Sequence, residues 1–394
     1  MLELQNKLDC CGCRACEQAC PRNCISILPD ECGFLYPKID PEVCINCGLC
    51  NKVCPFSHFE SKLDVEQQVY AMAHHDNFVI LSSSSGGVWS GICNWGINNG
   101  YSIYGVAFDN HQMPVYLKAV TLKECEAFRR SKYVQCNPEL VYGAIKKDLE
   151  NGDKVVFSGT PCFVKALRNF LRKDYEGLLT VDLICHGIPS PLVWRRYLDF
   201  LEKQYKGKIV SVNMRDKRLG WTHRSLTSVV LSDGREYCDT PATNTYMSGF
   251  GQELFYRPSC YECRFSNLDR PGDLTIGDFW EIEKYTRTFL GIKGVSCCIT
   301  NSSKGKRIID DIKDQFVLEE RKLSEALQPN LKAPTKKNQK TEMFWKDWVA
   351  ANGEFDKIAR VYFDYGIMTR LKYALITYFP FIKGLRSRIK KIIR

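Results

Sequence analysis

Apolar positions between Tyr70 and about Leu318 alternate between the spacing of strands and the spacing of helices. Short apolar runs predict strands at Tyr101–Phe108, Lys154–Ser158, Leu178–Ile184, Ile209–Asn213, Leu226–Leu231 and Leu274–Gly277. Longer stretches with helical periodicity predict helices at Val88–Asn98, Leu122–Arg130, Glu139–Glu150, Cys162–Arg172 and Pro191–Tyr205. The dipeptide Asp233-Gly234 separates two alternating runs and predicts a hairpin turn.

This alternation predicts an α/β or α+β core with at least one mixed sheet. The first 58 residues are instead rich in cysteine, and the polar residues 59–68 indicate a linker. We therefore expect four parts: a small module at 1–58, two halves of a mixed α/β core at 68–150 and 151–320, and a basic helical tail at 321–394.

Cysteine is the unusual component of this chain of 394 residues, which contains 21 cysteines, eleven of them between Cys10 and Cys54. The first residues have neither the basic n-region nor the apolar h-region of a secretory signal, and no apolar run is long enough to span a membrane. We therefore expect a cytoplasmic protein. In that reducing compartment, clustered cysteines are more often metal ligands than disulfides.

Positive charge is concentrated near the C-terminus. Residues 321–394 contain 17 Lys and Arg against 6 Asp and Glu, a net charge of +11, whereas the rest of the chain has a net charge of −1. This neutral body argues against a nucleic-acid-binding surface spread over the fold.

The last thirty residues combine that charge with apolar residues at helical spacing. From Tyr365 to Arg394 the chain has eight Lys or Arg and no Asp or Glu. This pattern predicts either a basic amphipathic helix that lies peripherally on the inner, anionic membrane surface, or a helix docked on the body or on a partner.

Two cysteine motifs with the same spacing follow one another in the N-terminal module. The first is Cys10-x-x-Cys13-x-x-Cys16-x-x-x-Cys20-Pro21, and the second is Cys44-x-x-Cys47-x-x-Cys50-x-x-x-Cys54-Pro55. In the bacterial ferredoxin motif the first three cysteines bind one 4Fe-4S cluster and the fourth binds the other. We therefore expect two clusters, one on Cys10, Cys13, Cys16 and Cys54, and the other on Cys44, Cys47, Cys50 and Cys20.

The alternative for this module is a pair of zinc sites, because Cys-x-x-Cys pairs also bind zinc. Zinc needs only four ligands and has no use for a third cysteine at the same spacing, so the tandem favours clusters. Cys11, Cys24 and Cys32 lie outside the repeat, and the sequence gives them no role.

A Ser-rich turn with two glycines precedes the first predicted helix of the core, at Ser84, Ser85, Gly86 and Gly87. Free N–H groups, hydroxyls and the helix dipole make such a turn a phosphate site, suited to the pyrophosphate of a dinucleotide. Ser131 and Lys132 follow another predicted helix, and Lys132 either pairs with the same phosphates or is solvated. The alternative for the turn is a plain helix cap.

Several motifs in the core occur in a fixed order. They are Ser82–Ser90, Ser131–Gln135, Phe157–Cys162, Asp182–Gly187, Met214–Arg218 with Gly220-Trp221, Cys260–Cys263 and Asp273–Trp280. In this order they resemble the coenzyme F-420 hydrogenase/dehydrogenase beta-subunit family, which also includes 7-hydroxymethyl chlorophyll a reductase. The resemblance covers roughly residues 70 to 315 and implies an FAD-binding iron-sulfur flavoprotein. It differs from the archaeal hydrogenase subunits, which as a type need no fused tandem ferredoxin, so it leaves the deazaflavin substrate open.

Four further cysteines, Cys162, Cys185, Cys260 and Cys263, lie in these motifs. Cys162 and Cys185 each follow a predicted strand, so both are expected at the carboxyl edge of one sheet, where ligands of α/β proteins bind. With the resemblance, the set predicts a third 4Fe-4S cluster; the alternative is four buried core cysteines. His186, Asp278 and Arg215 are polar candidates for the same region, and a structural role is the alternative for His186.

These features together predict an iron-sulfur flavoprotein oxidoreductase. Electrons would pass between the N-terminal clusters and FAD, to or from a redox partner protein or a small-molecule acceptor. The alternatives are a non-catalytic electron-transfer subunit of a larger complex and, more remotely, a zinc-stabilised scaffold. The sequence identifies no catalytic residue.

Overall fold

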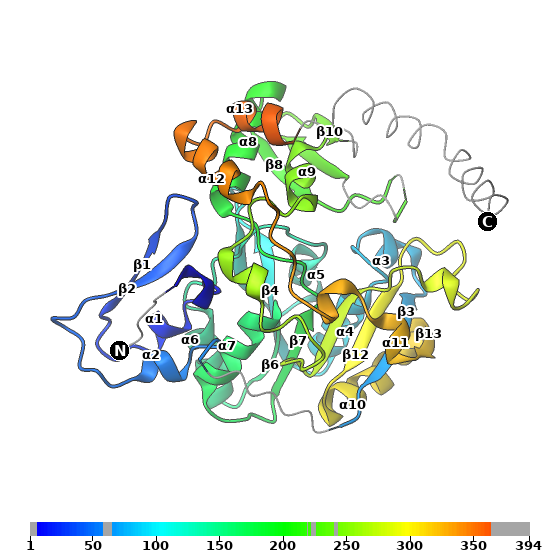
Figure 1. Cartoon of the computed structure of the whole chain (residues 1–394). Coiled ribbons are helices and arrows are strands. Elements are labelled where there is room, and N and C mark those ends of the chain that lie inside the picture. Colours follow the sequence, from blue (N-terminus) through cyan, green and yellow to red (C-terminus); the bar gives the residue numbers. More distant parts are fainter. Residues whose placement is uncertain (1–5, 58–64, 219, 222–225, 240–242, 364–394) are drawn as a thin grey trace. The chain divides into compact units, whose positions relative to one another are not determined.

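The computed structural model describes residues 6–57, 65–218, 220–221, 226–239 and 243–363. The chain divides into two compact units. The first comprises Met1–Leu192 and Tyr256–Lys337, and the second comprises Val193–Phe255 and Asn338–Arg394. Figure 1 shows the elements of both units, which we describe separately.

The N-terminal module lies in the first unit. A 3-10 helix at Lys7–Asp9 precedes the helices α1 (Ala15–Gln18) and α2 (Leu49–Lys52) and the strands β1 (Ile25–Pro29) and β2 (Leu35–Ile39). The two strands pair antiparallel, with Ile25 opposite Ile39. The module therefore combines two short strands with the one-turn helices of the two cysteine motifs.

Eight strands form the main sheet of the first unit, in the order β13-β3-β12-β11-β7-β6-β4-β5. Their bounds are β3 Gln68–His74, β4 Tyr101–Phe108, β5 Pro114–Ala119, β6 Lys154–Gly159, β7 Leu178–Leu183, β11 Leu274–Asp278, β12 Ser296–Thr300 and β13 Phe316–Arg321. Strands β4, β6, β7 and β11 are parallel to their neighbours in this series, and the remaining pairs are antiparallel. The mixed sheet expected from the sequence is confirmed.

Two helical layers cover the faces of this sheet. Helices α6 (Val141–Glu150) and α7 (Pro161–Leu171) pack on one face, and α4 (Val88–Asn98) and α10 (Ser303–Ile312) pack on the other (Figure 1). Side chains of β6 alternate between two hydrophobic cores. Val155 and Phe157 belong to the first core, which includes residues of α6 and α7, and Val156 belongs to the second core, which includes residues of α4 and α10. Cys11, Cys13 and Phe56 belong to the first core, so the module packs on the layer of α6 and α7.

Shorter elements complete the first unit. They are α3 (Asn77–Leu81), α5 (Leu122–Cys125), α11 (Leu323–Ala326) and 3-10 helices at Glu126–Phe128, Pro258–Glu262, Ile282–Lys284, Lys313–Gln315 and Pro329–Leu331. The single helix expected at Leu122–Arg130 is wrong in its second half, which tightens to a 3-10 turn and ends at Arg130 in the left-handed conformation. The helix expected from Glu139 begins two residues later, because Glu139 also has a positive φ.

The second unit contains a sheet of β8 (Ile209–Asn213), β9 (Thr227–Leu231) and β10 (Glu236–Asp239). Strands β9 and β10 form the hairpin expected at Asp233-Gly234. Helices α8 (Pro191–Tyr205), α9 (Thr245–Gly251), α12 (Thr341–Ala350) and α13 (Phe355–Tyr362) accompany it. Its core is aromatic, with ring contacts that join Tyr197, Tyr246 and Phe355.

The amphipathic helix expected between Tyr365 and Arg394 lies outside the described residues, as does most of the expected linker at 59–68. Within the described residues, no helix is both long and apolar enough to cross a membrane.

Candidate functional site

The two cysteine motifs have the same backbone. Gly12 and Arg14, on either side of Cys13, adopt left-handed conformations with φ of 72° and 59°. Asn46 and Gly48, on either side of Cys47, do the same with φ of 52° and 72°. Each loop then enters a one-turn helix, α1 or α2. Two left-handed residues bend each loop tightly around one point, so its thiols converge.

Each predicted ligand set gathers around one cavity. Cys10, Cys13, Cys16 and Cys54 line one cavity, which we call the first site. Cys20, Cys44, Cys47 and Cys50 line another cavity, which we call the second site. The fourth cysteine of each motif therefore lies at the cavity of the other motif. The second site has one exposed ligand, Cys47, whereas two ligands of the first site, Cys13 and Cys16, are buried and none is exposed.

The sulfurs of the two motifs are spaced more widely than around a single zinc ion. Four ligands around one zinc bring their sulfurs to within about 4 Å of one another. In the described residues, the one group of three ligand atoms within 4.8 Å is Asp30, Glu31 and Cys32, so no three of the motif sulfurs are that close. Burial raises the pKa of Cys16 well above its ordinary value, so the thiol of this dry site ionises only with a cationic partner.

A third group of cysteines lies at the carboxyl edge of the main sheet. Cys162 is the second residue of α7, directly after β6, and Cys185 follows β7 by two residues. Cys260 lies within the 3-10 helix Pro258–Glu262, and Cys263 follows it. Burial raises the pKa of Cys185 to about 12, and the neighbouring Cys162 and Cys263 contribute to the shift. The structure thus brings the four predicted residues together; we call this the third site.

Cys11 connects the first and third sites. The residue is 4% exposed, and it lies in one core cluster with Cys13 and Cys162, which raise its pKa well above the ordinary value. The hydroxyl of Tyr142 lies near the same three cysteines and is a buried group without a hydrogen-bond partner in the described residues. Sulfur acceptors at either site would give this hydroxyl a partner. Sequence reasoning missed Cys11, although its position directly after Cys10 departs from the spacing of the second motif.

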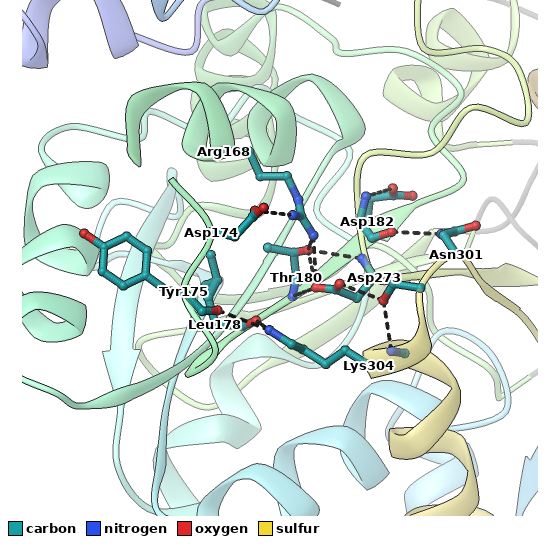
Figure 2. Close-up of polar contacts among 12 residues, drawn as sticks. Arg168, Asp174, Tyr175, Leu178, Thr180, Asp182, Asp273, Asn301 and Lys304 are labelled. Atoms are coloured by element: carbon teal, nitrogen blue, oxygen red, sulfur yellow. Dashed lines mark hydrogen bonds and ion pairs between the residues drawn. The ribbon is translucent and has the colours of Figure 1, made fainter. Parts of the chain in front are cut away.

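Ion pairs hold the strands that carry the third site, and in the first of them a partly exposed arginine meets a buried carboxylate. Figure 2 shows Arg168 of α7 paired with Asp273 at 3.1 Å, while Thr180 of β7 donates to the same carboxylate at 2.7 Å. Burial alone would raise the pKa of Asp273, but Arg168 and Thr180 hold it below its ordinary value. These contacts fix α7 and β7 against the segment that leads into β11.

A second ion pair acts on the loop after Cys263. Arg270 pairs with Asp182 of β7 at 2.5 Å, and both side chains are buried. Arg270 also donates to the carbonyl oxygens of Phe265 and Leu183. Removing one partner of such a pair is strongly destabilising because the other charge stays buried. The pair therefore ties the loop of Cys263 to the strand that leads to Cys185.

The Ser-rich turn and the segment after the second predicted helix also meet. The Ser84 hydroxyl accepts from the Ser131 N–H at 2.8 Å and lies 3.0 Å from the Ser131 hydroxyl. Lys132 donates to the carbonyl oxygens of Ala127 and Arg129, and burial lowers its pKa to about 7. Four of the six residues predicted to bind the cofactor thus lie in this one turn, and a fifth, Ser131, is hydrogen-bonded to it.

Some donors of this turn are already used inside the protein. Ser85 donates to the Val295 carbonyl oxygen at 2.8 Å, and the Gly86 N–H donates to the Ser296 hydroxyl at 2.9 Å. A Cβ at Gly86 would lie 2.2 Å from the Met72 carbonyl oxygen, so this glycine is required by strand packing.

The first turn of α4 retains a hydroxyl that suits a phosphate. Gly87 caps the helix with φ of 92°, and the Ser90 hydroxyl, three residues on, is buried without a partner in the described residues. A buried unpaired hydroxyl at a helix N-terminus fits the chemistry of a phosphate oxygen. Ser90 and the α4 N-terminus are therefore the groups that suit a phosphate, whereas Ser84 and Ser131 already bond to each other.

The remaining polar candidates have partners of their own or lie elsewhere. His186 Nδ1 lies 2.9 Å from Asn330 Oδ1, and its carbonyl oxygen accepts from Thr335. Asp278 is the last residue of β11, and its carbonyl oxygen accepts from Gln328. Arg215 is buried in the second unit.

Two family models match the chain. Residues 9–58 match the 4Fe-4S dicluster domain. Residues 152–326 match the model for the C terminus of the beta subunit of coenzyme F420 hydrogenase/dehydrogenase.

Individual relatives match the same two regions. The F subunit of the F(420)H(2) dehydrogenase of Methanosarcina mazei is 24% identical over 188 residues, 45% of this chain and 53% of that protein, so the chain spans about half the length of this relative. A 7Fe ferredoxin of Hydrogenibacillus schlegelii is 38% identical over 66 residues, 16% of this chain and 78% of the ferredoxin. A protein of the F420-reducing [NiFe] hydrogenase complex of Methanosarcina barkeri has a TM-score of 0.44 and 14% identity, covering 75% of this chain and 90% of that one.

Proposed function

Because the chain carries a 4Fe-4S dicluster domain followed by the C-terminal domain of the coenzyme F420 hydrogenase/dehydrogenase beta-subunit family, we propose that it is an iron-sulfur flavoprotein oxidoreductase. In this proposal electrons pass between the two N-terminal clusters, a third 4Fe-4S cluster on Cys162, Cys185, Cys260 and Cys263, and FAD. The acceptor or donor is a redox partner protein or a small molecule.

The observation that carries this proposal is the position of Cys11. This residue belongs to the loop of the first site, yet it is buried in the same core cluster as Cys162 of the third site, and Cys13 and Cys162 both raise its pKa. A ferredoxin domain that only carried electrons to other proteins would have no need of a cysteine group at its inner side. This position favours a continuous route from the module into the core.

The protein's own residues have three tasks along this route. The cysteines supply thiolates, and the ion pairs Arg168–Asp273 and Arg270–Asp182 keep the loops of the third site in position. The core that contains Cys11 and Phe56 excludes water between the first and third sites. FAD would supply the exchange between one-electron and two-electron chemistry.

The flavin part of the proposal rests on the first turn of α4. Ser84, Ser90 and Ser131 would bind the pyrophosphate there, and Lys132 lies close to Ser131 along the chain. The combined substitution Ser84→Ala and Ser131→Ala removes two hydroxyls without filling the turn, so the protein should fold with reduced FAD content. Gly86→Val is not a useful variant, because it would disrupt strand packing.

A second candidate function is a non-catalytic electron-transfer subunit. It is favoured by the names of the relatives, which are a subunit of a dehydrogenase and a component of a hydrogenase complex. Their names also make coenzyme F420 the first small molecule to test as acceptor. Absence of flavin from fresh anaerobic protein would favour this second function.

For the C-terminal residues 365–394 we propose, from sequence alone, a cytoplasmic location with peripheral binding to anionic membranes. Truncation after residue 364 should abolish co-sedimentation with anionic vesicles and leave the iron content unchanged. Equal sedimentation of both proteins would assign the segment to docking.

Anaerobic analysis of iron, sulfide and flavin tests the main proposal. The protein should contain about twelve irons, and Cys263→Ala should contain about eight, because one four-iron cluster is lost. Cys297→Ala is a matched control, since this buried cysteine lies in β12 outside the three sites. An unchanged iron content in Cys263→Ala would exclude the third cluster.

A further inference from the structure

One arginine of the core reaches into the first site. Arg257 precedes the 3-10 helix that carries Cys260, and its side chain is fully buried. Its Nη2 donates to Cys10 Sγ at 3.3 Å, and its Nε donates to the Cys10 carbonyl oxygen at 2.6 Å. A single guanidinium thus binds the first ligand of the module through both sulfur and backbone.

The other contacts of Arg257 keep it in place. Nη2 also donates to the Leu35 carbonyl oxygen at 2.9 Å, and Nη1 donates to Gln135 Oε1 at 3.1 Å. The guanidinium carbon lies 4.3 Å from the ring centroid of Tyr36 and 5.5 Å from that of Phe34. The backbone N–H of Arg257 donates to Ile188, while its carbonyl oxygen accepts from Cys260.

None of the ion pairs of the described residues includes Arg257, so no carboxylate balances this buried cation. A fully buried charge without a counter-charge is strongly unfavourable. An anionic group in the cavity beside Cys10 removes that cost. A thiolate-bound 4Fe-4S cluster in the first site is such a group.

We propose that Arg257 is a positioning residue that raises the reduction potential of the first cluster and so directs electrons from the module towards the third site. Reduction adds negative charge to the cluster and its sulfurs. A cation and an N–H donor at Cys10 Sγ stabilise this reduced form more than the oxidised form. The proposal deepens the function proposed above, but its first step requires only the first cluster.

Burial alone would act in the opposite direction. The first site is enclosed by the core, and a low-dielectric environment disfavours the more highly charged, reduced state. The second site has Cys47 at the surface, so solvent stabilises its reduced state. Without Arg257, electrons would therefore remain at the second cluster. The arginine offsets the penalty of burial at the place where the route enters the core.

The absence of a side chain at Gly12 leaves room for Arg257. A Cβ at Gly12 would lie 2.7 Å from Arg257 Nη1 and 2.3 Å from Gln135 Nε2. The equivalent residue of the second motif is Asn46, which is exposed. The sulfurs of the second site have Cys24 and Asn46 as their side-chain partners in the described residues, not a cation.

The test is an EPR-monitored redox titration of the full-length protein with Arg257→Gln and Arg257→Lys. Signals are assigned with a variant that lacks the second cluster, Cys20→Ala combined with Cys24→Ala. In Arg257→Gln the midpoint potential of the first cluster should fall by at least about 59 mV. For a one-electron couple this shift corresponds to a tenfold change in the ratio of oxidised to reduced cluster. The second cluster should keep its midpoint, and Arg257→Lys should give a smaller fall.

Arg14→Gln is the matched control. Arg14 also lines the cavity of the first site, but it pairs with Glu17 and Asn137 rather than with a ligand sulfur. An unchanged midpoint in Arg257→Gln, an equal shift of both clusters, or an equal shift in Arg14→Gln would overturn the proposal. If Arg257→Gln fails to assemble its clusters, the midpoint potential of the first cluster in Arg257→Lys tests the proposal. It should lie below the wild-type value, and an unchanged value would overturn the proposal. A missing third cluster would contradict the proposed function without affecting this result.

Discussion

The first and second sites are built from the same loop and differ in what surrounds them. Both loops have left-handed residues on each side of the middle cysteine and lead into a one-turn helix. The first site is enclosed by the core, with Cys11 and Arg257 next to its ligands. The second site has Cys47 and Ile45 at the surface, and Ile45 is 59% exposed.

Under the proposed function, this difference gives the two copies of the motif different roles. Ligand geometry, which the repeat preserves, selects the kind of metal group. Exposure, charge and hydrogen bonds, which the repeat does not preserve, determine its potential and its partners. The exposed second site suits exchange with an external partner, and the enclosed first site suits transfer into the core.

Removal of single ligands should have the largest effect. Cys54→Ala should lose about four irons from the first site, because the crossed arrangement places Cys54 at the first cavity. Cys20→Ala should retain its cluster with an altered EPR signal, because Cys24 Sγ lies 3.3 Å from Cys20 Sγ and can replace it. Combining Cys20→Ala with Cys24→Ala should remove about four irons.

Iron and sulfide analysis with EPR checks these variants. The second-cluster signal should survive in Cys54→Ala and disappear in the double variant, whereas the signal of the third cluster should remain in both. Loss of the same signal in both proteins would contradict the crossed assignment of ligands.

The next largest effect is expected in the rate at which the two N-terminal clusters lose iron, because their ligands differ in solvent exposure. Under a mild anaerobic chelator, the second cluster should lose its iron several-fold faster than the first, because Cys47 is accessible to solvent. Iron release followed by absorbance should therefore be biphasic, and Cys54→Ala should lack the slow phase attributed to the first cluster. Simultaneous loss of both clusters would show that exposure at Cys47 does not control access.

A pair of glycines separates backbone strain from contact with the core. Gly12 and Gly48 both have φ of 72°, but a Cβ at Gly48 meets nothing within 4 Å. Gly48→Ala should cost about 1 kcal/mol of stability, as expected for a left-handed non-glycine residue. Gly12→Ala should cost about 1–3 kcal/mol more, because it displaces Arg257 and Gln135.

The temperature at which cluster absorbance is lost compares the two glycine variants. Gly12→Ala should also lower the midpoint potential of the first cluster, whereas Gly48→Ala should not change it. Equal thermal shifts in the two variants would contradict the close contact at Gly12.

The smallest effect is expected at Tyr142. Its buried hydroxyl, without a partner in the described residues, lies near Cys11, Cys13 and Cys162. Tyr142→Phe should leave the iron content unchanged and lower the midpoint of the first or third cluster by less than Arg257→Gln does. Tyr36→Phe is the control. It also removes a buried hydroxyl without a partner in the described residues, but it keeps the ring that contacts Arg257.

Local features of the fold could be predicted from the sequence, since they depend on neighbouring residues. The strands at Tyr101–Phe108 and Ile209–Asn213 and the helices at Val88–Asn98 and Pro191–Tyr205 have the bounds that periodicity predicts. The grouping of the cysteines also follows from spacing. The helix at Leu122–Arg130 is shorter than predicted, because the chain must turn at Arg130 for Ser131 to reach Ser84.

The surroundings of the sites depend on contacts between distant residues and could not be predicted. Arg257 and Cys10 are 247 positions apart, and no motif marks the arginine. Cys11 and Cys162 meet only because the module packs on α7. Gly86 resembles a phosphate-binding glycine in sequence, yet the Met72 carbonyl oxygen explains its lack of a side chain. Pattern predicts ligands, whereas packing determines their environment.

Addition of one electron equivalent per protein tests the central claim most directly. The electron occupies the site of highest potential, and EPR identifies that site by comparison with the ligand variants. The account predicts a signal from the first or third cluster in the wild-type protein, with the second cluster still oxidised; where that signal belongs to the first cluster, Arg257→Gln should reduce or abolish it. A signal from the second cluster alone in the wild-type protein would contradict an inward route for electrons.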